Sequence, residues 1–112
     1  MTTPLEQIKE ARAEAKATIE LANQLEKLRK NRAFNAVFTE FVFKELPVRS
    51  ANVFGRPELN ESAQKNIDNT LVMISTLNHT LSNIYTQAEQ AQQTLIEINE
   101  AEAEYLAEGE DE

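Results

Sequence analysis

Residues 67–105 read IDNTLVMISTLNHTLSNIYTQAEQAQQTLIEINEAEAEY, and this stretch decides the fold because apolar and small side chains recur in it every three and four residues. One heptad position is occupied by Ile67, Ile74, Leu81, Ala88 and Leu95. The other is occupied by Thr70, Leu77, Ile84, Ala91, Ile98 and Tyr105. A pattern sustained in this way is typical of a helix that packs along another helix. We therefore expect a helix from about residue 60 to about residue 107, with Asn60 as its N-cap.

The first part of the chain is the candidate partner helix. Thr3 and Glu6 have the spacing of a capping box, and a proline directly follows the cap. Residues 11–17, ARAEAKA, have high helix propensity. We expect one helix from about residue 4 to about residue 46, ended by Pro47.

Residues 36–43 fit two local structures. Their β-branched and aromatic side chains suit a β-strand, which would place a strand hairpin at the tip of two long helices. We favour helix, because Phe38 and Phe41 continue the helical spacing and Glu40 precedes Lys44 by four residues.

Residues 47–59 form the expected connection, where Gly55 and Pro57 supply turn chemistry. Two helices of matched length with one short connection predict an all-α fold, a long antiparallel two-helix hairpin of coiled-coil type. Its domain covers residues 1–107, and residues 108–112 form an acidic tail. The residue numbers of two facing positions in this hairpin then sum to about 106, so Ile8 is expected opposite Ile98.

Charge is distributed unevenly along the 112 residues. The net charge is −8, and all 11 Lys and Arg residues lie at or before Lys65. The remaining 47 residues carry ten acidic side chains and no Lys or Arg, so direct nucleic-acid binding is not expected. The chain has no cysteine, and its start has no signal-peptide pattern.

Two segments are candidate protein interfaces. Residues 69–88 contain no charged side chain, which suggests helix contacts on more than one side and therefore a homo-oligomer. The polar side chains among them argue against a membrane span. All five phenylalanines lie within residues 34–54, either as a local plug at the hairpin tip, which we favour, or as an exposed patch for a partner. The predicted interface residues are Phe34, Phe38, Phe41, Phe43, Phe54, Leu71, Ile74, Leu77, Leu81, Ile84 and Tyr85.

One basic cluster, Lys27, Arg29, Lys30 and Arg32, stands out in the first half. The simplest interpretation is a solvated helix face. The alternative is a docking surface for an acidic partner, such as residues 97–112 of a neighbouring subunit.

No catalytic set is visible in the sequence. His79 is the single histidine and has neither cysteine nor a nearby carboxylate beside it, so we expect no metal site. A nucleophile, base and orienting group cannot be assembled around it, and no glycine-rich phosphate loop exists. We expect no enzyme activity and no cofactor.

Residues 28–49, LRKNRAFNAVFTEFVFKELPVR, resemble a segment of small uncharacterised helical proteins of tailed bacteriophages. The resemblance covers about a fifth of the chain and is carried by Asn31, Phe34, Val37, Glu40, Phe43, Glu45 and Arg49. This chain departs from the pattern at Pro47 and at Phe41, where a glycine is usual.

The resemblance implies a helical phage protein, present in the host cytoplasm or the virion. Its expected function is non-catalytic: a structural or assembly protein that self-associates and binds a phage structural protein. The alternative is an inhibitor that binds a host protein through the phenylalanine-rich end or the acidic C-terminal run.

Overall fold

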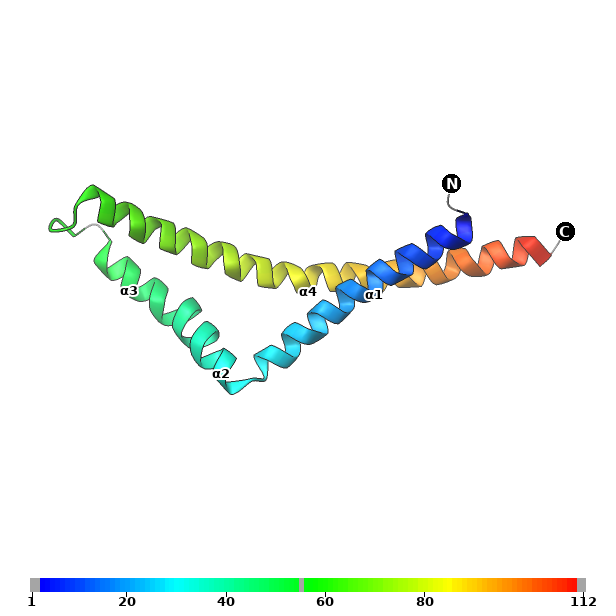
Figure 1. Cartoon of the computed structure of the whole chain (residues 1–112), viewed down its shortest axis with the longest axis horizontal. Helices are drawn as coiled ribbons and strands as arrows, with labels where there is room; N and C mark the ends of the chain where they lie inside the picture. Colours follow the sequence, from blue (N-terminus) through cyan, green and yellow to red (C-terminus); the bar gives the residue numbers. More distant parts are fainter. Residues whose placement is uncertain (1–2, 55, 111–112) are drawn as a thin grey trace. The chain divides into compact units, whose positions relative to one another are not determined.

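The computed structural model describes residues 3–54 and 56–110, with only the backbone at residue 110, and these residues form helices and turns without a strand (Figure 1). The prediction of an all-α fold is confirmed. In chain order the elements are α1 (Pro4–Arg29), α2 (Arg32–Phe34), the π-helix η1 (Asn35–Glu45), α3 (Leu46–Val53) and α4 (Glu61–Glu110). No described helix is long and apolar enough to cross a membrane.

Both predicted helix starts are confirmed by their caps. The Thr3 backbone N–H donates to Glu6 Oε2 at 3.1 Å, and the Glu6 N–H donates to Thr3 Oγ1 at 3.1 Å, which completes a capping box. At the start of α4 the Ala63 N–H donates to Asn60 Oδ1 at 2.8 Å. These bonds satisfy amide donors that the first turn of a helix leaves without an intrahelical partner.

The prediction of a single first helix over residues 4–46 is wrong, because the helix is interrupted at Lys30 and Asn31. Asn31 has extended backbone angles (φ −81°, ψ 125°), and its Oδ1 accepts from the Phe34 N–H at 2.9 Å. Asn35 Nδ2 donates to the carbonyl of Arg29 at 2.6 Å. Asn31 therefore ends one helix and caps the next, a role that strong helix formers on both sides conceal in the sequence.

Residues 36–43 are helical, as favoured, but the helix is of the π type. In η1 the hydrogen bonds reach back five residues, as the Leu46 N–H does to the Phe41 carbonyl. Most π-helical segments are single-turn bulges, so the eleven residues of η1 make a long one.

Pro47 does not end the helical run, and this expectation is also wrong. It lies in the first turn of α3, a position where proline is well tolerated because its fixed φ suits a helix. Helix therefore continues to Val53, and the connection expected over residues 47–59 is confined to residues 54–60, of which Gly55 lies outside the described residues. At the other end, α4 includes residues 108–110 of the expected tail, while residues 111 and 112 lie outside the described range.

The chain divides into two compact units. Unit 1 comprises Met1–Gln24 and Asn83–Glu112, and unit 2 comprises Leu25–Ser82. In unit 1, α1 and the second half of α4 lie side by side and antiparallel (Figure 1). In unit 2 the end of α1, α2, η1, α3 and the first half of α4 follow one another. The prediction of one domain over residues 1–107 stays a prediction.

The heptad pattern gives the buried face of α4 correctly. Every heptad position from Ile67 to Ile98 is buried or half-buried, and only Tyr105 is exposed. The predicted register is also present in unit 1, because Ile8 and Ile98 line one hollow and Ala15 and Ala91 line another.

The buried core is small and rich in alanine. It consists of Ala15, Ala22, Leu25, Ile74, Ala88, Ala91 and Ile98. No side chain of the described residues is less than 2% exposed. Alanine allows two helices to approach closely, yet its single methyl group contributes only about 0.8 kcal/mol of burial, against about 1.5–3 kcal/mol for a leucine or isoleucine. The helices are thus well matched but weakly held by their own core.

Candidate interaction site

The aromatic segment of unit 2 is organised around the Asn31 cap. That cap places Phe34 at the entry to η1, and the rings of Phe34 and Phe38 stack with centroids 4.9 Å apart and an interplanar angle of 24°. Such an offset pair contributes about 0.5–1.5 kcal/mol beyond its area. Thr39 Oγ1 also donates to Asn35 Oδ1 at 3.0 Å, so hydrogen bonds reinforce the same turns.

Arg49 links η1 to α3. Its guanidinium carbon lies 5.8 Å from the centroid of the Phe41 ring, and its Nη2 lies 3.3 Å from Glu45 Oε2. Lys44 and Glu40 form a second pair at 3.6 Å. All four charged side chains are more than half exposed, so these contacts position side chains on a surface and add little stability.

The phenylalanines do not form the closed plug that we favoured. No residue of α2, η1 or α3 is buried. Phe34, Phe38 and Phe43 are half-buried, whereas Phe41 is 39% and Phe54 is 48% exposed. Each of the five phenylalanines is thus more than half covered, but none is fully enclosed, and Phe54 keeps the largest exposed fraction.

The predicted interface residues on α4 lie mostly toward the chain's own interior. Ile74 is buried, and Leu71, Leu77, Leu81, Ile84 and Tyr85 are half-buried. Within the uncharged segment 69–88, the large apolar side chains that face outward are Val72 and Met73, at 58% and 57% exposure, and we did not include them. The heptad assignment contained the signal, because both residues fall between its two core positions. His79 is exposed.

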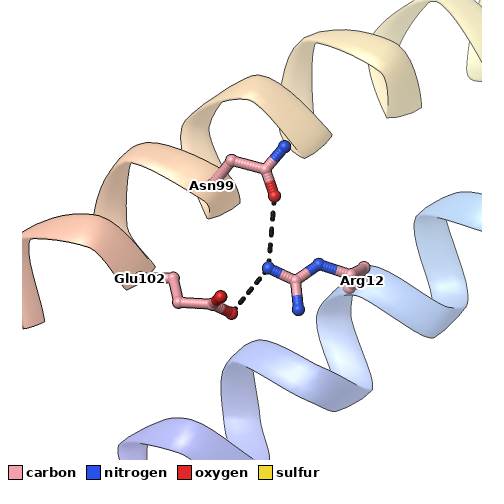
Figure 2. A network of polar contacts seen from close by, with 3 residues as sticks. All are labelled: Arg12, Asn99 and Glu102. Carbon is pink, nitrogen blue, oxygen red and sulfur yellow. Dashed lines mark hydrogen bonds and ion pairs between the residues drawn. The ribbon is translucent and has the colours of Figure 1, made fainter. Parts of the chain in front are cut away.

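In unit 1 two shallow hollows of about 310 Å³ and 410 Å³ follow the seam between the helices. They share Ala11 and Thr94, so together they form one groove lined by small, polar and apolar side chains. Beside the groove Arg12 crosses from α1 to α4, and its Nη2 lies 2.6 Å from Glu102 Oε2 and 3.1 Å from Asn99 Oδ1 (Figure 2).

Beyond the groove, the end of α4 carries a series of exposed carboxylates. Glu97, Glu100, Glu104 and Glu108 are exposed and follow one another at spacings of three and four, so they share one face of the helix. Tyr105 is 39% and Leu106 is 49% exposed in the same turns. We call these six residues the acidic end.

Among the described residues, no group of three or more His, Asp or Glu side chains is placed to hold a metal ion. What they present is surface: the exposed apolar side chains of unit 2, and the groove and acidic end of unit 1. Comparison with protein families, with curated proteins and with solved structures gives no match.

Proposed function

We propose that this chain is a non-catalytic helical protein that works by self-association and protein binding, as a structural or assembly protein of a tailed bacteriophage. The observation that carries the proposal is the weakness of its own core, in which four of seven buried residues are alanine. Small helical chains with such cores gain stability by association.

The exposed apolar side chains supply what association would bury. Val72, Met73 and Val48 are each more than half exposed. Covering one such side chain completely is worth about 1.5–3 kcal/mol. Because residues 69–88 carry no charge, a second helix can lie on this part of α4 without desolvating an ion.

The phage assignment is supported by the segment that resembles phage proteins. Asn31 caps a helix there, and Glu45 pairs with Arg49. Positions that carry the resemblance therefore make local contacts with one another, as expected of a structural unit shared among related proteins. The protein would act in the host cytoplasm during assembly or in the virion.

Self-association is tested by light scattering and sedimentation velocity on the full chain at micromolar concentration. We expect an oligomer. The dissociation constant of the double variant Val72→Ser/Met73→Ser should be higher than that of the wild-type chain by about tenfold or more. Leu21→Ser is the control, because Leu21 is 54% exposed on α1 but lies outside the uncharged segment. A purely monomeric wild-type chain would overturn the proposal.

A second candidate function is an inhibitor that binds a host protein, and the exposure of Phe41 and Phe54 favours it. Host lysate is passed over the wild-type chain and over Phe41→Ser/Phe54→Ser. A stoichiometric host protein lost with this variant supports inhibition, whereas co-purification of the chain with virions supports the structural function.

A further inference from the structure

The two helices of unit 1 do not end together. Pro4, the first residue of α1, and Ala101 line the same hollow, so α4 continues for nine residues, 102–110, past the start of its partner. Tyr105 lies on this extension. It continues the heptad position of Ile98, which is buried, yet it is 39% exposed. The heptad positions of α4 therefore continue beyond the first described residues of α1, the helix that covers them.

The electrostatics of this extension are unfavourable in the isolated chain. The last turn of α4 has no basic residue, and the C-terminal end of a helix carries negative partial charge. Glu104 and Glu108 add carboxylates at that end, and neither has an ion pair among the described residues. A cationic partner there would relieve repulsion among these groups.

The chain itself carries a matching surface in unit 2. Lys27, Lys30 and Arg32 are exposed and have no ion pair within the part of the chain that the structure describes. Leu28 lies among them and is 48% exposed. This surface combines cations with one large apolar side chain, and the acidic end combines carboxylates with Tyr105 and Leu106.

The charges of the two units favour unlike contacts between copies. Residues 1–24 and 83–112 contain 13 acidic and three basic side chains, a net charge of −10. Residues 25–82 contain six acidic and eight basic side chains, a net charge of +2. Two copies of unit 1 repel each other, whereas unit 1 of one copy attracts unit 2 of another.

We propose that the acidic end of one copy binds the basic cluster around Leu28 of a second copy, so that the chains associate head to tail. The inference rests on the self-association proposed above and names its partner surfaces. Burial of Leu28 against Tyr105 and Leu106 supplies affinity, while the charges set orientation, because exposed ion pairs contribute little each. Head-to-tail contacts produce a ring if the rotation closes, and a filament otherwise.

Two charge-reversal variants of the full chain test the inference. Lys27→Glu/Lys30→Glu reverses two of the four charges of the basic cluster, and Glu104→Lys/Glu108→Lys reverses two of the four charges of the acidic end. Each variant alone then places like charges against each other at the substituted positions of every junction, and its association should weaken by about tenfold or more. Mixed in equal amounts, the two variants can alternate along the assembly, which places opposite charges at the substituted positions of every junction, so sedimentation velocity should again show the wild-type oligomer.

Two controls separate this effect from folding and net charge. Glu58→Lys/Asp68→Lys changes the net charge by the same amount as the acidic-end variant, at exposed positions outside both surfaces, and should leave association unchanged. Circular dichroism should show unchanged helix content, and Glu104→Lys/Glu108→Lys improves the charge at the end of α4. Loss of association by this variant is therefore not loss of helix.

The outcomes distinguish the inference from the function it rests on. A wild-type chain that is monomeric throughout overturns both. A wild-type oligomer that neither charge reversal weakens overturns the head-to-tail contact alone. The same holds if both variants dissociate but their mixture stays dissociated.

Discussion

The Arg12 guanidinium lies 2.6 Å from a carboxylate oxygen of Glu102 and joins the two antiparallel helices of unit 1 (Figure 2). The side chains are only 27% and 33% exposed, so solvent screens the pair less than a free surface pair. The alanines of the core are small and repeated, and several registers would pack them almost equally well. A single pair with one geometry selects among those registers.

Removing the Arg12–Glu102 pair should lower the free energy of unfolding by more than removing an exposed ion pair does. A double-mutant cycle with Arg12→Met and Glu102→Gln should give a coupling energy of about 1 kcal/mol in urea unfolding. The matched cycle on Arg49 and Glu45, which are 67% and 52% exposed, should give about 0.3–0.5 kcal/mol. Equal coupling energies in the two cycles would contradict the role assigned to Arg12.

The close approach of α1 and α4 depends on alanine. Ala88 is 6% exposed, and Ala88→Leu adds three carbons at this buried position, so we expect the free energy of unfolding to fall by about 1–3 kcal/mol. Ala103→Leu is the control on the exposed side of the same helix and should change stability by less than about 0.5 kcal/mol. Thermal and urea unfolding measure both variants. Stabilisation by Ala88→Leu would show a loosely packed seam instead.

The Asn31 cap should contribute measurably to unit 2. Asn31→Ala removes the acceptor for the Phe34 N–H and should cost about 1 kcal/mol, whereas Asn31→Asp keeps an acceptor and should cost only a few tenths. Hydrogen exchange at Phe34 reports the same loss locally. If Asn31→Ala and Asn31→Asp have equal stability, the cap hydrogen bond does not stabilise the start of this helix.

The π-helix η1 should open more readily than α4. None of its residues is buried, whereas Ala88, Ala91 and Ile98 of α4 are. Amide protons exchange fastest where few apolar contacts oppose local opening. We expect residues 35–45 to exchange at least about tenfold faster than residues 86–98, measured by NMR below the concentration of association. Comparable protection would show that η1 is stabilised by contacts beyond those described.

Much of the helical framework could be predicted because its causes are local or periodic. The capping box at Thr3 and the Asn60 cap follow from residue type and spacing alone. The buried face of α4 follows from a strict heptad pattern, and its one failure, Tyr105, lies where the described partner helix has already ended.

The helix break, the π-helix and the exposed apolar side chains could not be predicted, because the sequence around them is also compatible with a continuous α-helix. The helix break at Asn31 has good helix formers on either side. In the sequence, only the residue type of Asn31, which is a favoured N-cap, signals the break. The π-helix has no sequence period that distinguishes it from an α-helix over eleven residues. Exposure at Val72, Met73 and Phe41 depends on which neighbours cover them, and composition does not specify neighbours.

Unit 1 contains both the capped start of α1 and the last turns of α4, and the two lie at the same end of the helix pair (Figure 1). A pulling force applied between residues 3 and 109 therefore acts across the seam instead of along it. The contacts break one after another from that end, and each resists alone. The same two helices pulled lengthwise in opposite directions would have all their contacts resisting at once, so this pair separates at low force when it is held by its own chain ends.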